Sequence, residues 1–132
     1  MKGYIGNIEK DTKENENFRK VLYTAKNSQL VLMCLLPGEE IGEEVHEEHD
    51  QFFRFEEGEG KVVINGTESA VSDGFAVVVP AGAKHNVINI SGNKKLKLYT
   101  IYSPPEHKDG ILHKTKADAL SDNEHFDGKI TE

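Results

Sequence analysis

Short apolar segments recur along most of this chain, and turn-forming residues separate them. Val, Leu, Ile, Tyr and Phe dominate these segments, and none is long enough for a typical globular helix, so they predict β-strands. Asn65-Gly66 is the strongest hairpin signal, because this dipeptide suits a tight turn with two positive φ angles. The expected strands are 18–24, 29–36, 43–46, 51–56, 60–64, 68–71, 75–79, 85–90 and 96–102. Strands that recur about every 8–12 residues indicate an all-β sandwich or barrel.

The two ends of the chain differ from this strand-rich region. Residues 1–17 are polar and predict a loosely attached N-terminal arm that contributes at most one edge strand. Residues 18–103 are the expected barrel, and residues 104–132 are a polar C-terminal extension in which 116–120 can form a short helix. We therefore expect a single domain with an arm and an extension.

The C-terminal extension carries features that suit a cover for the barrel. Two prolines turn the chain directly after the last expected strand, and Ile111-Leu112 gives the segment a small apolar anchor. We therefore expect residues 104–115 to be ordered against the barrel, with His107 or His113 nearer to its mouth than His125.

Composition narrows the classes of partner. The chain has 132 residues and a formal net charge of −7, from 16 basic and 23 acidic residues. This charge argues against a nucleic-acid partner, because phosphate neutralisation needs a basic face. The sequence has no apolar stretch of transmembrane length, its start lacks the apolar region of a signal peptide, and Cys34 is its only cysteine. We expect a cytoplasmic protein that binds a small molecule and no membrane.

Acidic side chains are concentrated in one segment. Between Glu39 and Gly60 the chain has ten acidic residues and a single basic one, Arg54. Most of these carboxylates are expected to form a solvated surface. One or two can instead point inward beside the local histidines, where a bound divalent cation would relieve their mutual repulsion.

Two glycine-bounded segments contain the strongest functional signal. The first reads Gly38-EEIGE-Glu44-V-His46-EEHD-Gln51-FFRFEE-Gly58, and the second reads Gly74-FAVVV-Pro80-A-Gly82-AK-His85-NVI-Asn89. Both resemble the two motifs of small single-domain cupins of the cupin-2 type. The second segment matches at every position. The first matches in spacing, but Glu44 stands where the family has a histidine and Gln51 stands where it has a glutamate.

The resemblance covers about residues 28–103 and implies the fold and the site. It implies a cupin double-stranded β-helix, which is a jelly-roll barrel, and a homodimer. It also implies a divalent metal ion, such as Mn, Fe, Ni, Co or Zn, held by Glu44, His46, Gln51 and His85. Two imidazoles and one carboxylate are the ligand type of non-haem iron oxygenases. The alternative is a metal-free cavity in which these four side chains hydrogen-bond one another around water.

The resemblance does not identify the reaction, because one fold hosts many functions. One hypothesis is a small metal-dependent enzyme of isomerase or dioxygenase type that acts on a small polar molecule. Similar proteins are often labelled mannose-6-phosphate-isomerase-like, but no Lys/Arg cluster suited to a sugar phosphate lies near the motifs. The other hypothesis is a non-catalytic module that binds or senses a metal or a small ligand. An enzyme needs an acid–base group beside the metal, and the candidates are His49, Tyr99, His107 and His113.

Overall fold

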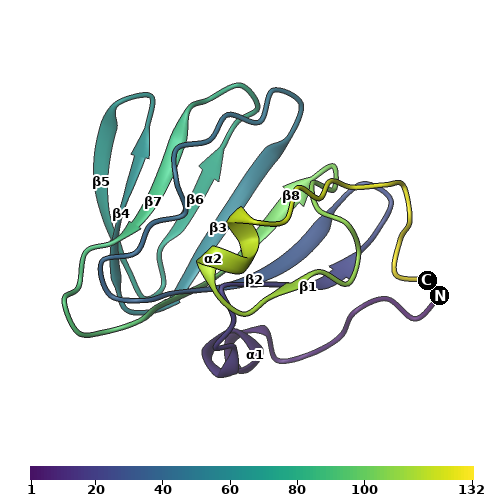
Figure 1. Ribbon diagram of the computed structural model, residues 1–132, viewed down its shortest axis with the longest axis horizontal. Coiled ribbons are helices and arrows are strands. Elements are labelled where there is room, and N and C mark those ends of the chain that lie inside the picture. Colours follow the sequence, from purple (N-terminus) through teal and green to yellow (C-terminus); the bar gives the residue numbers. More distant parts are fainter.

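The protein is a barrel of two antiparallel sheets, which the computed structural model describes over residues 1–132 (Figure 1). One sheet has the strand order β6-β3-β8-β2-β1-β9, and the other has the order β5-β4-β7. The all-β prediction is therefore confirmed. Neither of the two helices is long and apolar enough to cross a membrane. The elements are α1 (Ile8–Glu14), β1 (Arg19–Thr24), β2 (Gln29–Leu35), β3 (Asp50–Glu57), β4 (Glu59–Ile64), β5 (Thr67–Ser72), β6 (Ala76–Val79), β7 (His85–Asn89), β8 (Leu96–Ser103), β9 (Leu112–His113) and α2 (Lys116–Leu120).

The core lies between the two sheets. Phe53 and Phe55 of β3 are fully buried there and pack in one cluster with Leu98 of β8 and Val87 of β7. Gln51 shares their face of β3 because side chains alternate along a strand. The strand pattern that buries the phenylalanines therefore also turns the Gln51 amide inward, where it is 3% exposed.

The hairpin predicted at Asn65-Gly66 is present. It joins β4 to β5, and both turn residues have positive φ angles, 48° for Asn65 and 84° for Gly66. A second glycine is required by space: Gly58 has a φ of 98°, and a Cβ there would collide with the carbonyl oxygen of Lys95.

The prediction of a loose N-terminal arm is wrong. Residues Ile8–Glu14 form helix α1, whose first turn is capped by the Asn7 side chain. Lys97 is 4% exposed, and its ammonium group donates to the Lys13 carbonyl and lies 2.9 Å from Glu16. The helix packs against β3 and β8, so the arm is fixed to the sheet. The arm is polar throughout, but an Asn cap precedes a helix in which four of the seven residues are the helix formers Glu and Lys.

The strand expected at 43–46 is also absent as a regular element. This segment instead makes an isolated antiparallel bridge to β7, in which Glu44 and His85 exchange two backbone hydrogen bonds of 2.9 Å each. Gly42 has a φ of 110°, outside the β region, and this interrupts the extended chain before a ladder can form. The bridge still lays Glu44 beside His85.

The C-terminal extension is ordered against the large sheet, as expected. Strand β9 pairs with β1, with Arg19 opposite His113. The buried Gln29 amide donates to the His107 carbonyl at 2.7 Å and accepts from the His107 N–H at 2.9 Å. At the two termini the Lys2 N–H donates to the Glu132 carboxylate at 2.6 Å, so the chain ends meet (Figure 1).

Asn89, the last residue of the second motif, has a structural role. Its buried side chain donates to the carbonyl oxygens of Leu35, Leu36 and Lys94 at 3.1, 3.1 and 2.8 Å. One amide thus joins the end of β2, the end of β7 and the loop before β8.

We expect Asn89→Ala to lower the free energy of unfolding by about 2–3 kcal/mol, because it removes three side-chain hydrogen bonds to partly buried carbonyl groups. Chemical denaturation measures this change. The matched control is Asn93→Ala in the same loop, whose side chain is exposed. An equal effect of the two substitutions would contradict the role assigned to Asn89.

Candidate metal centre and its surroundings

Three candidate ligands converge at one end of the barrel. One ligand atom from each of Glu44, His46 and His85 lies within 4.8 Å of the other two. Glu44 and His46 come from the segment before β3, and His85 opens β7. The backbone bridge between Glu44 and His85 brings these ligands together. A further hydrogen bond of 2.9 Å, from the Gly82 N–H to the His46 carbonyl, holds the backbone of His46 next to the loop before β7.

His46 has a carboxylate at each ring nitrogen. Its Nε2 lies 2.8 Å from Glu44 Oε2, and its Nδ1 lies 3.8 Å from Glu106 Oε2. Glu106 belongs to the C-terminal extension, two residues after Pro104. Histidine ligands of metals commonly direct their second nitrogen toward a carboxylate, which orients the ring. Glu106 stands in that position relative to His46.

His85 and Gln51 form the fourth corner of the cluster. Nδ1 of His85 lies 3.0 Å from the Ala83 carbonyl, to which it donates, so a neutral ring keeps its lone pair on Nε2. That Nε2 lies 3.1 Å from Oε1 of Gln51, whose amide nitrogen donates to Thr100 at 3.0 Å. Two acceptor atoms therefore face each other, as ligand atoms do around a cation. This donor set fits a divalent ion.

Tyr102 closes one side of the cluster. It lies opposite Gln51 in the pairing of β3 with β8, is 2% exposed, and its ring centroid lies 5.7 Å from that of His46. Tyr99, a candidate from the sequence, lies on the other face of β8, where its ring contacts Phe52. Residues three positions apart on a strand lie on opposite faces, so Tyr99 points away from the candidate ligands.

His49 lies beside the cluster but outside it. Its Nε2 is 3.2 Å from Glu106 Oε2 and 3.0 Å from the Pro105 carbonyl, and its ring centroid is 5.9 Å from that of His46. Strand alternation placed His49 on the opposite face from His46 if the strand continued, but the extended chain has already ended there. His49 and Glu106 thus form a pair next to the candidate ligands.

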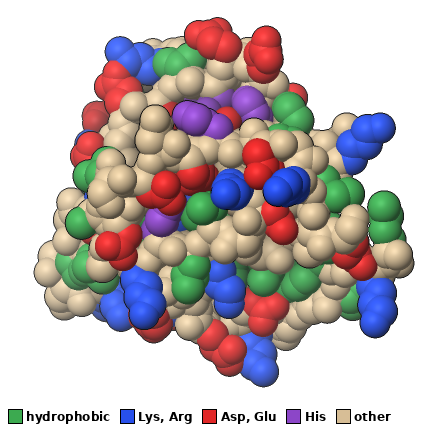
Figure 2. Space-filling model, turned by 45° about the vertical axis from the view of Figure 1, so that its right-hand side comes forward, with side chains coloured by type: hydrophobic (Ala, Val, Ile, Leu, Met, Phe, Trp, Pro, Cys, Tyr) green, Lys and Arg blue, Asp and Glu red, His purple; other side chains and the backbone are tan.

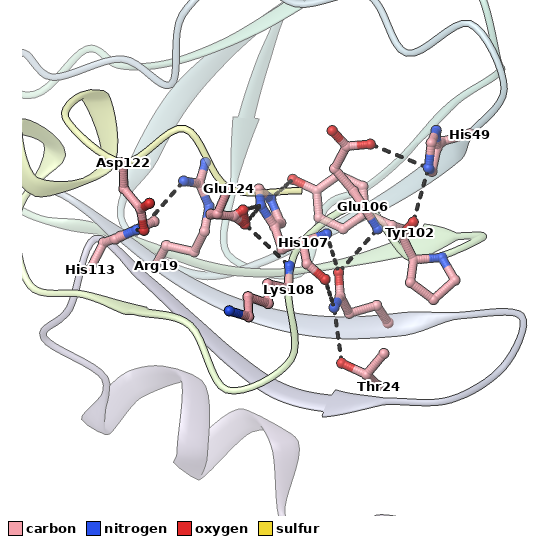
Figure 3. Close-up of polar contacts among 12 residues, drawn as sticks. Arg19, Thr24, His49, Tyr102, Glu106, His107, Lys108, His113, Asp122 and Glu124 are labelled. Atoms are coloured by element: carbon pink, nitrogen blue, oxygen red, sulfur yellow. Dashed lines mark hydrogen bonds and ion pairs between the residues drawn. The ribbon is translucent and has the colours of Figure 1, made fainter. Parts of the chain in front are cut away.

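A second histidine group lies under the C-terminal extension (Figure 3). Nδ1 of His107 lies 2.7 Å from Glu124, and Nε2 lies 3.3 Å from the Tyr102 hydroxyl. Nε2 of His113 lies 2.9 Å from Asp122, and Nδ1 lies 3.4 Å from Nη1 of Arg19. His107 therefore contacts Tyr102, whose ring packs on His46, whereas His113 contacts Arg19.

A pocket of about 230 Å³ lies between the extension and the barrel. Glu44 lines it, so the pocket reaches the candidate ligands, and its wall includes Arg19, Glu106, His107, His113 and Glu124. Figure 2 shows histidine side chains in a hollow bordered by acidic side chains. Of the six histidines of the chain, three line this pocket, two belong to the candidate ligands, and His49 lies next to those ligands.

Sequence reasoning missed three residues of this region. Tyr102 shares the inward face of β8 with Thr100, and Arg19 shares the inward face of β1 with Val21, so strand alternation could have found both. Glu106 had no local signal beyond the Pro104-Pro105 turn, because its position depends on how the extension folds back.

Burial and ion pairing act in opposite directions on the histidines. For His46, burial lowers the pKa, but the hydrogen bond to Glu44 and its charge outweigh burial and raise the pKa above 6.5. The same contact outweighs burial at Glu44 and holds its pKa below 4.5. For His107, burial is the larger effect and lowers the pKa despite the bond to Glu124. The two histidines are therefore expected to titrate on opposite sides of the ordinary value.

Known proteins resemble this chain over most of its length. The family model described as "Cupin domain" matches residues 31–102. The Bacillus subtilis protein YrkC is 47% identical over 126 residues, which span 91% of this chain and 67% of that protein. A protein of Acanthamoeba polyphaga mimivirus is 40% identical over 113 residues, covering 83% of this chain and 70% of its own length. The crystal structure of BH2720 from Bacillus halodurans is 45% identical, with a TM-score of 0.87 over 90% of this chain and 94% of that one.

In metal-free protein, NMR titration should find His46 titrating above pH 6.5 and His107 below it. The His46 ion pair then stabilises the fold most between about pH 4.5 and pH 6.5. This contribution disappears as the pH rises through the raised His46 pKa, and also as the pH falls through the lowered Glu44 pKa. Burial of His107 acts in the opposite sense, because protonation of its ring in acid opposes folding.

Glu44→Gln should lower the His46 pKa and leave the His107 pKa in place, because His107 pairs with Glu124 instead. A His46 pKa that does not respond to Glu44→Gln would contradict the ion pair as its cause.

Proposed function

This chain belongs to the cupin domain family, and on that premise we propose that it is a small metal-dependent enzyme acting on a small polar molecule. The observation that carries the proposal is the convergence of Glu44, His46 and His85 within 4.8 Å. The Gln51 oxygen, which faces the His85 lone pair, is the fourth ligand. When bound, a divalent ion would supply Lewis-acid chemistry or the binding of oxygen.

The residues around the cluster prepare the ligands for this role. The Ala83 carbonyl holds Nδ1–H of His85, and Glu106 faces Nδ1 of His46, so both rings present Nε2 to the centre. Such partners fix the tautomer and the ring orientation, and they increase the basicity of a ligand. Glu44 supplies the negative charge that a carboxylate at position 51 would otherwise supply.

The His49–Glu106 pair favours an enzyme over a passive binding module. Neither residue belongs to the group of convergent ligands, yet His49 lies beside His46 and is hydrogen-bonded to the extension. An imidazole next to a carboxylate can accept and return a proton near neutral pH. We therefore assign acid–base transfer to His49, with Glu106 as its orienting partner, and a supporting role to His107 through Tyr102.

A non-catalytic binding or sensor module is the second candidate, and one observation favours it. If the Gln51 amide is reversed, its nitrogen donates to Nε2 of His85 and its oxygen accepts from Thr100, so the conflict between the two acceptors disappears. Glu44 and His46 already satisfy each other. In this arrangement the polar cavity holds together without an ion, and the pocket receives a ligand directly.

Metal analysis of purified protein tests the first proposal. Wild type should contain about one divalent ion per chain, and His46→Ala and His85→Ala should each reduce this content more than about tenfold. Gln51→Glu should tighten binding, because a carboxylate adds charge to the ligand set. His125→Ala is the matched control, since this exposed histidine lines the pocket but is not one of the convergent ligands, and it should leave the metal content unchanged. Equal metal content in wild type and His85→Ala would end the metal proposal.

A homodimer is part of the proposal. Strand β6 is an edge of the large sheet, and it exposes Val78, while the neighbouring Phe75 is 50% exposed. Edge strands with exposed apolar side chains tend to pair with another surface. Light scattering at micromolar concentration should therefore give about twice the 14.7 kDa mass of one chain, and Val78→Lys should shift it toward the monomer. A monomer for wild type would refute this assembly.

A further inference from the structure

Arg19 is a buried cation with too few partners. Its side chain leaves β1 toward the C-terminal extension, and the residue is only 9% exposed (Figure 3). Nε has no hydrogen-bond partner, and the guanidinium makes one long contact of 3.4 Å, from Nη1 to His113. The group otherwise stacks on the Phe18 ring at 5.3 Å. A guanidinium has five N–H donors, and a buried one normally uses most of them.

The carboxylates of the pocket do not supply the missing partners. Each of them instead contacts a histidine: Glu44 with His46 at 2.8 Å, Glu106 with His49 at 3.2 Å, Asp122 with His113 at 2.9 Å and Glu124 with His107 at 2.7 Å. None lies within ion-pair distance of Arg19, and the other arginine of the chain, Arg54, lies 2.9 Å from Glu56. The pocket thus holds four acids that already have partners and two cations, Arg19 and Lys116, of which Arg19 is buried and has no acid within ion-pair distance.

We propose that Arg19 binds the carboxylate of a small substrate or ligand that occupies the pocket between the barrel and the C-terminal extension. A guanidinium fork and a carboxylate match in plane and in spacing, and such pairs form two parallel charge-assisted hydrogen bonds. A carboxylate suits this site better than a phosphate dianion, since each carboxylate group brings one negative charge to the guanidinium, whereas a phosphate concentrates two charges on one group among four acidic side chains.

The place of the pocket relates this group to the metal cluster. Glu44 lines the pocket and also belongs to the three convergent ligands, so a molecule held at Arg19 extends toward the cluster. The positive charge of Arg19 helps to lower the pKa of Glu44, after the larger effects of burial and of His46, which agrees with their proximity. The volume of about 230 Å³ admits a small acid rather than a long chain. The assignment of this acid as a substrate rests on the proposed metal-dependent function; the binding by Arg19 does not.

The two arginines make a direct experiment possible, because their Nε–H groups give only two side-chain NMR signals. We would titrate ¹⁵N-labelled protein with malonate, with the neutral isostere malonamide and with inorganic phosphate. Malonate should shift the Arg19 signal and leave that of Arg54, which faces Glu56, in place. Malonamide and phosphate should shift neither. Equal shifts of both signals with malonate, or no shift of either, would overturn the proposal.

Substitutions then separate recognition from simple charge balance. Arg19→Lys keeps the charge but loses the planar fork, and should weaken malonate binding about tenfold by calorimetry. Arg19→Gln should weaken it by at least about tenfold, the loss expected for a hydrogen bond between charged groups. Unchanged malonate affinity in Arg19→Gln would overturn the proposal. If a variant does not fold, the wild-type NMR titration still decides.

The same titration in His85→Ala distinguishes this proposal from the metal proposal. Malonate should still shift the Arg19 signal there, because the binding group lies outside the metal ligands. If wild type holds metal but malonate never affects Arg19, the carboxylate subsite is wrong and the metal proposal stands. If Arg19 responds in a protein that holds no metal, the metal proposal fails and the subsite stands.

Discussion

The antiparallel bridge between Glu44 and His85 is the contact on which the arrangement of the site depends. Two backbone hydrogen bonds of 2.9 Å tie the irregular segment before β3 to the first residue of β7. Side chains of directly paired residues lie on the same side of a sheet, so this bridge presents the Glu44 carboxylate and the His85 imidazole together. His46, two residues further, follows to the same side. A slip by one residue would turn these side chains away from one another, which is why the surrounding turns matter.

The C-terminal extension adds a second layer of control to this centre. It enters over the barrel at Glu106, is fixed at His107 by the buried Gln29 amide, and pairs with β1 through β9. The four carboxylates that line the pocket each face an imidazole, so the negative charge there is distributed over local pairs. Through these backbone contacts and charge pairs, the C-terminal extension forms one wall of the pocket.

The sequence predicted the parts of the site that depend on local spacing. Motif spacing and strand alternation brought Glu44, His46, Gln51 and His85 to one end of the barrel, and the structure has them there. Alternation also distinguishes Tyr102 from Tyr99, although the sequence interpretation selected the latter. Tyr102 is the inward tyrosine because it lies two positions from the fully buried Thr100.

Other features depend on tertiary contacts that local patterns do not contain. Helix α1 is polar, and its packing depends on Lys97 of β8, far away in the chain. Glu106 is one acidic residue among many until the extension folds back onto the barrel. Arg19 has no motif, and its lack of a carboxylate partner becomes visible only when all four neighbouring acids are seen with their histidines.

The first motif differs from the cupin pattern at Glu44 and Gln51, and this exchange places a candidate ligand on the wall of the pocket. The cupin pattern places its carboxylate at position 51, on a strand and inside the barrel, and here a neutral amide that is 3% exposed occupies this position. The carboxylate stands instead at Glu44, whose side chain is 31% exposed and lines the pocket. The number of carboxylates among the candidate ligands is unchanged, but the charge has moved from the barrel interior to the boundary with the pocket. An anion that approaches the cluster from this side would be repelled by Glu44 alone. A buried cation on the same wall offsets that repulsion, and Arg19 lies there.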